Sequence, residues 1–309
     1  MDGNVYWHGC CSIFTGSYGK ERQKLPRFQM FLICGLLSVS CDLSKNHSRS
    51  AGQTEDSSIL GQRLVRDVWE GRDRLLNFSS DTAVAIIYEM YVGGDEVRAP
   101  YGGPSKTYWQ GIRKALQGYT YSYLFQSKDA YLKSAHLDPG LDDDFVHFFS
   151  HHPGEGSRLA TYRFYLNLKG DHHSFIRDLF PLIEERPGDY FKIAGPKSLG
   201  TRADGLVYYT KTSGDELLDL EARLKALVTA SSNAFSPTTP AMTEELLPGL
   251  SKAFNPAKDS FGKLQSKIMF RALLLREEDS FTGFKKALIQ EYMANKIDPM
   301  KPWEKIYCP

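Results

Sequence analysis

The residue types best suited to bind an anion gather on one face of a predicted sheet. Residues 162–168, 190–194 and 206–209 are patterned as strands, and the first two segments alternate apolar with polar side chains, because successive strand side chains point to opposite faces. One face of this sheet is therefore apolar, and the other carries cations and tyrosines. The polar residues on that face, or at the mouth of the third strand, are Arg163, Tyr165, Asn167, Lys192, Arg202 and Asp204.

A guanidinium group binds phosphate through two parallel hydrogen bonds, and an ammonium group adds a point charge. The pattern thus predicts an anion site for a phosphorylated ligand, with Arg163, Arg202, Tyr165 and Lys192 as the phosphate-binding residues. The alternative is an antiparallel sheet with one solvated face, which shows the same alternation without any function. In either case we expect Arg202 to be exposed, so that its removal leaves the protein folded.

The alternation also predicts which side chains form the core. On the apolar face we expect Phe164, Leu166, Phe191 and Ile193 to be buried. This expectation depends on a regular register, since a slip of one residue would exchange the two faces.

Histidines supply candidate proton donors near this sheet. His147, His151 and His152 lie close together in the sequence, and His173 follows His172. A zinc site needs three or four converging ligands, and no cysteine or carboxylate stands at a matching spacing, so we expect no metal site. His152 and His172 are instead candidates for a general acid. Loop histidines without a role are the alternative.

Other catalytic motifs are incomplete. Residues 103–107 (GPSKT) and 195–198 (GPKS) lack the full spacing of a nucleotide-binding phosphate loop. The chain contains no G-x-S-x-G nucleophile elbow. Four of the five cysteines stand in the first fifty residues, outside the region that carries the other polar candidates. Nucleotide hydrolysis and a cysteine nucleophile are therefore not expected.

Composition narrows the class of protein. The 309 residues are 41% hydrophobic and carry a net charge of +1, so a substantial core is expected and the basic surface of a nucleic-acid binder is not. No run of about 18 apolar residues predicts a membrane span. The odd, clustered cysteines predict no disulfide framework, and the rest of the chain suits a reducing compartment.

The beginning of the chain predicts a leader. Residues 1–55 are Ser-rich and poorly patterned, which is typical of a poorly ordered segment. Residues 20–39 are first basic and then apolar, as in part of a signal peptide. A signal peptide or a translation start further along the chain are the alternatives.

Periodicity predicts an α+β fold, with a mainly antiparallel sheet flanked by helices. Residues 119–125 form a further candidate strand, residues 147–158 a loop, and residues 233–255, with three prolines, an extended crossing segment. Besides one amphipathic helix between the first two strands, the predicted helices cover residues 59–76, 82–91, 106–116, 214–230, 260–275 and 280–294.

The order of several segments resembles a known family. YRFYLNL, YFKIAGP and RADGLVYYT are followed by LPGL and then by NPAKDSFGKLQSKIMFRALL. Over residues 88–307 this order resembles the HopA class of bacterial type III effectors, with Gly249 and residues 260–262 (SFG) as distinctive late markers. The same domain resembles lyase components of lanthipeptide-type biosynthesis. The resemblance implies a leader over residues 1–55 and a HopA-like domain over residues 56–309. We expect that domain to comprise a helical subdomain (56–135) and a sheet-containing subdomain (136–309).

Two functions follow from this resemblance. The first is an effector that is secreted into a host cell and binds or modifies immune or signalling proteins there, with a secretion chaperone as a further partner. The second is a lyase that eliminates phosphate from phosphorylated Ser or Thr in a protein or peptide, with a cytoplasmic location as the alternative. In the lyase, Lys192 would remove the Cα proton, Arg163 and Arg202 would hold the phosphate, and His152 or His172 would protonate it. Neither function requires a cofactor.

Overall fold

The computed structural model of the chain describes residues 63–93, 105–125, 131–133, 145–150, 160–169 and 172–306. The leader predicted over residues 1–55 lies outside these ranges, as does His152. Across the described ranges, no helix combines the length and the apolar character that a bilayer span requires.

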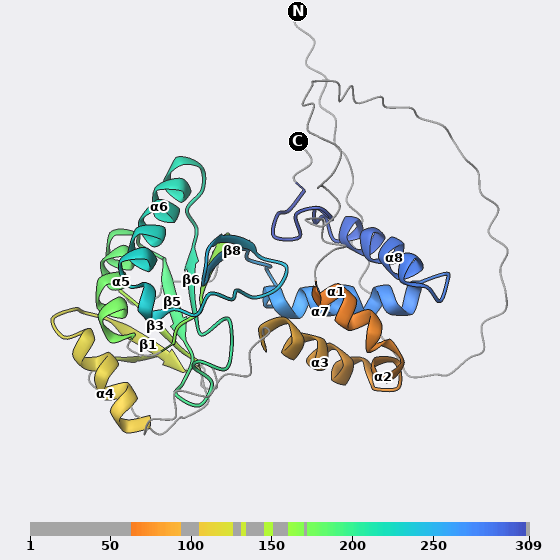
Figure 1. The fold of residues 1–309 in the computed structure, drawn as a ribbon. Helices are drawn as coiled ribbons and strands as arrows, with labels where there is room; N and C mark the ends of the chain where they lie inside the picture. Colours follow the sequence, from red (N-terminus) through yellow and green to blue (C-terminus); the bar gives the residue numbers. More distant parts are fainter. Residues whose placement is uncertain are drawn as a thin grey trace, which may run out of the picture. The chain divides into compact units, whose positions relative to one another are not determined.

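The described strands form one antiparallel sheet (Figure 1). Their order across the sheet is β2-β1-β3-β5-β6-β4-β8-β7. Each neighbouring pair is antiparallel, and the central strands β5, β6 and β4 pair over four or five residues each. The strands are β1 (Ser122–Phe125), β2 (Tyr131–Lys133), β3 (Val146–Phe149), β4 (Tyr162–Leu166), β5 (Tyr190–Ile193), β6 (Leu206–Thr210), β7 (Glu244–Leu247) and β8 (Leu250–Phe254).

Helices cover both faces of this sheet, because two separate apolar clusters meet its two sides. Helices α4, α5 and α6 pack on the face of Phe164 and Phe191, whereas α1, α3, α7 and α8 pack on the face of Tyr165 and Val207. The α+β prediction is therefore confirmed. The helices are α1 (Arg63–Glu70), α2 (Arg72–Leu76), α3 (Ser80–Gly93), α4 (Ser105–Ala115), α5 (His173–Glu185), α6 (Gly214–Ala230), the short 3-10 helix η4 (Ser232–Ala234), α7 (Phe261–Leu275) and α8 (Phe281–Ala294).

The predicted alternation of faces is confirmed, but both faces of β4 and β6 are largely buried, and on β5 the side chains of Tyr190 and Lys192 are half-buried. Phe164, Leu166, Phe191 and Ile193 are fully buried in the first cluster. Tyr165 is buried in the second cluster, beneath α3 and α7. The solvated-face alternative is therefore wrong, because the C-terminal helices supply a second apolar layer over the polar-looking side of the strands.

Residues 233–255 are not the extended crossing segment that their prolines predict. They contain η4 and the hairpin of β7 and β8, which pair with a bulge between Glu245 and Leu247. Gly249 allows the turn, since its φ is +82° and a Cβ there would lie 2.4 Å from the Ser236 carbonyl oxygen. The prolines stand outside the paired residues, so they interrupt the pattern without preventing the hairpin.

Two further boundaries differ from the prediction. His147 lies inside strand β3 and not in a loop, because Val146 and the aromatic residues after it pair with both β1 and β5. The single helix predicted over residues 59–76 is divided at Gly71 into α1 and α2. Ser260 and Ser280 cap α7 and α8 as predicted, with their hydroxyls accepting hydrogen bonds from Lys263 and Gly283.

Candidate functional site

Lys192 lies at the centre of a short row of side chains that crosses the sheet. It faces His147 on β3 and Val207 on β6, and Val207 in turn faces Tyr165 on β4. Because directly opposite residues of antiparallel strands project to the same face, these side chains all point toward the helices of the second cluster. The register therefore places Lys192 and Tyr165 on one face, as predicted.

Two cations meet over one aromatic ring at this position. The Lys192 Nζ lies 4.1 Å from the centroid of the Phe145 ring, and the Arg202 Cζ lies 5.5 Å from the same centroid. An aromatic face attracts cations through its quadrupole. Lys192 and Arg202 therefore share one aromatic neighbour, the ring of Phe145.

Arg202 is bound by a carboxylate. It is largely buried, so the prediction that it is exposed was wrong. Its Nε donates to Asp204 Oδ1 at 2.8 Å, and its Nη2 donates to Asp204 Oδ2 at 3.2 Å and to the Tyr88 hydroxyl at 3.0 Å. The side chains of Arg202 and Asp204 are only 18% and 4% exposed. Burial is the largest single effect and opposes the charged guanidinium, but the charge and hydrogen bonds of Asp204, with smaller effects of Tyr88 and Glu89, together raise the pKa of Arg202. The hydrogen bond to Tyr88 was not predicted, because α3, which carries Tyr88, is distant in the sequence from residue 202.

Gly262 fixes the position of Tyr88. A Cβ at Gly262 would lie 2.4 Å from Tyr91 Cε1 and 2.8 Å from the ring of Tyr88, so glycine is required for α3 and α7 to approach this closely. Burial, followed by the Asp204 charge, raises the pKa of the Tyr88 hydroxyl well above its usual range. The hydroxyl therefore stays neutral and accepts from Arg202. The SFG segment thus has a physical role, with Ser260 as the helix cap and Gly262 as the contact.

Lys192 forms no ion pair with any carboxylate among the described residues, and it lies opposite His147 in the strand register. The His147 ring stacks with Tyr190 and Tyr209 at centroid distances of 5.8 and 6.5 Å. Burial, and then the Lys192 charge, lowers the pKa of His147 to about 3. His147 is therefore neutral at physiological pH and leaves the charge of Lys192 uncompensated.

Arg163 lies on the same face but in a separate cluster. It is 5% exposed, its Nη2 donates to the Asn255 side chain, and its Cζ lies 5.2 Å from the Tyr209 ring centroid. In the strand register, Arg163 lies two strands across the sheet and two residues along it from Lys192. This corresponds to roughly 12 Å between the two Cα atoms. Asn255 is oriented by donating to the Ala160 carbonyl at 2.8 Å, so Arg163 is held away from Lys192.

Tyr165 lies beside Arg163. Burial raises the pKa of Tyr165 to about 12, against the opposing effect of the Arg163 charge. The phenol is therefore neutral, and Arg163 has no anionic partner among the described residues. The four predicted phosphate-binding residues thus divide into two groups, Lys192 with Arg202 and Arg163 with Tyr165.

His172 lies on the other side of the sheet. It precedes α5, it is fully buried, and its ring centroid lies 5.0 Å from Tyr108 and 4.5 Å from His173. Tyr108 belongs to the cluster beneath α4 and α5, whereas Lys192 points to the opposite face. The structure does not bring His172 to Lys192. Within the described ranges, no group of three or more His, Cys, Asp or Glu side chains could hold a metal ion.

The arrangement favours binding an anion. Lys192 supplies an uncompensated charge, Arg202 supplies a fixed guanidinium over the same ring, and that ring, Phe145, supplies an apolar wall. Phe145 and Tyr88 were not among the predicted site residues. Phe145 could have been predicted from its position two residues before His147, since residues at this spacing on a strand share one face. Nothing local in the sequence connects Tyr88 with residue 202.

Comparison with known proteins relates this architecture to bacterial effectors. A solved structure titled the effector protein from Pseudomonas syringae pv. tomato strain DC3000 is 18% identical, with a TM-score of 0.57 over 80% of this chain and 100% of that chain. The effector protein from Pseudomonas syringae pv. syringae strain 61 is 15% identical, with a TM-score of 0.60 over 79% of this chain and 96% of that chain. At these identities the likeness concerns the fold alone.

No curated protein matches the sequence. The family model of the HopA1 effector protein family, by contrast, matches residues 137–303, which is more than half of the 309 residues and includes Phe145, Lys192 and Arg202. The resemblance predicted from the order of the segments is confirmed, and this chain belongs to the HopA1 effector protein family.

Proposed function

We propose that this protein acts inside a host cell by binding an immune or signalling protein, and that it recognises a phosphorylated side chain on that target. The observation that carries the proposal is the meeting of Lys192 and Arg202 over the ring of Phe145. A phosphate dianion placed there gains two charge-assisted contacts. The family membership supports the effector role.

The charge balance supports an anion as the ligand. Asp204 neutralises Arg202 but does not pair with Lys192, so an added anion would meet one uncompensated cation and one cation that is already oriented. The half-buried position of Lys192 strengthens this attraction, since charges interact more strongly where water is partly excluded. Binding without chemistry is favoured because His172, a predicted general acid, lies beneath the opposite face of the sheet.

The proposal can be tested with a library of phosphothreonine peptides with randomised flanks and its unphosphorylated counterpart. We expect only the phosphorylated library to raise the unfolding temperature of the full chain. At about a hundredfold excess over the dissociation constant, the stabilisation is about 2.7 kcal/mol. Lys192→Met should remove the response, and Lys169→Met, at an exposed position, should retain it. Equal responses to both libraries would contradict the proposal.

A phosphothreonine or phosphoserine lyase is the second candidate, and the position of His147 opposite Lys192 on the neighbouring strand favours it. His147 is held neutral, so it could accept the Cα proton while the Cα–H electron pair forms the Cα=Cβ double bond and the Cβ–O bond breaks to release the phosphate, whose charge Lys192 would meet. Arg202 would then stabilise the departing dianion. Mass spectrometry of the same library distinguishes the candidates, since only the lyase removes phosphoric acid from the peptides. Lys192→Met should abolish that loss.

The proposal also assigns a role to the leader and to the domain that follows it. Residues 1–55 act as the secretion segment, which a secretion chaperone binds, and residues 56–309 act as the effector domain. Deleting residues 1–55 should abolish delivery into host cells while leaving the cooperative thermal unfolding of the remaining chain unchanged. A deletion variant that no longer unfolds cooperatively would contradict this assignment.

A further inference from the structure

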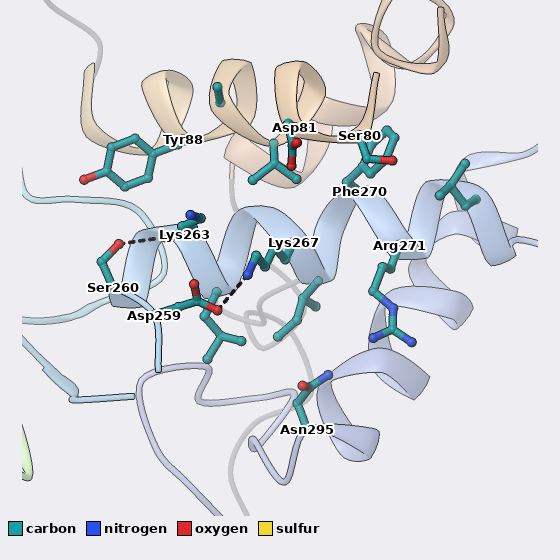
Figure 2. A pocket seen from close by; sticks show the side chains of 15 residues that line it. Ser80, Asp81, Tyr88, Asp259, Ser260, Lys263, Lys267, Phe270, Arg271 and Asn295 are labelled. Carbon is teal, nitrogen blue, oxygen red and sulfur yellow. Dashed lines mark hydrogen bonds and ion pairs between the residues drawn. The ribbon is translucent and has the colours of Figure 1, made fainter. Parts of the chain in front are cut away.

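A groove of about 790 Å³ runs along α3 and α7. Figure 2 shows that side chains of both helices line it, with Tyr88 at one end and Arg271 and Asn295 at the other. Tyr88 also accepts from Arg202, but Lys192, Arg202 and Phe145 do not line the groove. The groove is therefore a second surface, separate from the anion site.

The α7 side of the groove is positively charged. Lys263, Lys267 and Arg271 are four residues apart, so they form one stripe along the helix. Lys267 pairs with Asp259 at 2.8 Å, and Arg271, whose side chain is 63% exposed, contacts Glu291 at 3.2 Å. Lys263 is exposed and has no ion pair with any described residue. The stripe therefore keeps an excess of positive charge.

On the α3 side, Ser80 and Asp81 line one part of the groove, whereas the rest of that side and the floor are largely apolar. Val84, Ala85 and Tyr88 stand at helical spacing on α3, opposite Leu264 and Ile268 of α7. At the far end, Leu274 is 56% exposed, which is unusual for a leucine that lines a concave surface. An apolar floor beside a row of cations is the surface that an amphipathic helix with carboxylates on its polar flank would complement.

We propose that this groove binds an acidic amphipathic helix of a partner protein. The lining residues of α7 extend from Ser260 to Leu274, which corresponds to about 21 Å, or about four turns of a partner helix. Apolar side chains of that helix, at i, i+3, i+4 and i+7, pack on Val84, Ala85 and Leu264. Its carboxylates lie along the stripe and pair first with Lys263, the cation without a partner.

The test uses a designed helical peptide of about 18 residues, with leucines at the stated spacing and glutamates beside them. Its affinity for the full chain is measured by fluorescence anisotropy. Two control peptides have lysines in place of the glutamates or the same composition in scrambled order. We expect the acidic helix to bind at least about tenfold more tightly than either control, with an affinity that falls as salt rises.

Substitutions at two exposed residues test whether the peptide binds in the groove. Lys263→Glu reverses the free charge, and Ala85→Arg fills the apolar floor, while Lys286→Glu changes an equally exposed lysine of α8 that does not line the groove. The first two variants should each weaken binding about tenfold with unchanged thermal unfolding, and the third should bind as the parent does. The proposal is overturned if the acidic peptide does not bind, if the lysine peptide binds equally, or if Lys286→Glu weakens binding as much as Lys263→Glu.

Discussion

Removing the Arg202 side chain should destabilise the whole fold, although an exposed arginine would contribute little. Arg202→Ala leaves the Asp204 carboxylate, which is 4% exposed, without both of its guanidinium hydrogen bonds. Breaking a buried ion pair from one side costs about 3–5 kcal/mol. Because the Arg202 side chain is 18% exposed, we expect a loss near the lower end, about 3 kcal/mol.

The loss can be measured by urea unfolding of the full chain, followed by tryptophan fluorescence and circular dichroism. A second variant tests its cause, since Asp204→Asn in the Arg202→Ala background removes the unpaired charge and should restore about 1 kcal/mol or more. Arg177→Ala, which breaks an ion pair at the surface of α5, should leave the unfolding midpoint unchanged. A loss below about 1 kcal/mol for Arg202→Ala, or a double variant no more stable than the single one, would refute the reasoning.

Three further predictions concern the sheet and its covering helices. Phe191→Ala should lower the free energy of unfolding by about 3–5 kcal/mol in urea, because the ring is fully buried against the ring of Phe148. A loss below about 1 kcal/mol would contradict this, since it would mean that neighbouring side chains fill the cavity. In the folded protein the pKa of His147 is lowered to about 3, whereas in the unfolded chain this histidine has its ordinary pKa of about 6.5. The unfolded state therefore binds one more proton than the folded state as the pH falls below about 6.5. Stability should therefore fall by about 1–2 kcal/mol from pH 7 to pH 5, and His147→Phe should remove that part of the slope. Gly262→Ala should lower the unfolding midpoint through the clash with α3, whereas Gly93→Ala, with nothing within 4 Å of the added Cβ, should not; equal effects would contradict the contact.

The alternation of side chains made the central strands and one buried face predictable from the sequence. Tyr162 to Leu166 and Tyr190 to Ile193 pair as their patterns predict, and the serines at 260 and 280 begin helices as their capping role predicts. These features depend on local chemistry, either the period of a strand or a hydroxyl that accepts a backbone hydrogen bond.

The composition of the site was less predictable, because it depends on contacts between segments distant in the sequence. Arg163 and Lys192 share a face, but the binding of Arg163 by Asn255 separates them, and no local pattern indicates that contact. The burial of Arg202 depends on Tyr88 and on the close approach that Gly262 allows. The hairpin of β7 and β8 was not predicted, because the prolines in this segment indicate an extended crossing, although they lie outside the paired residues.

Residue-specific acylation of lysines, read by mass spectrometry, tests the central claim most directly. The full chain is labelled alone, with the phosphothreonine peptide library, and with its unphosphorylated counterpart. The account predicts that phosphorylated peptides protect Lys192, which lies 4.1 Å from the Phe145 ring, while the exposed Lys169 reacts equally in every case. Equal labelling of Lys192 in the presence and absence of phosphopeptide, or equal protection by the unphosphorylated library, would contradict the assignment of a phosphate-binding site to Lys192 and Arg202.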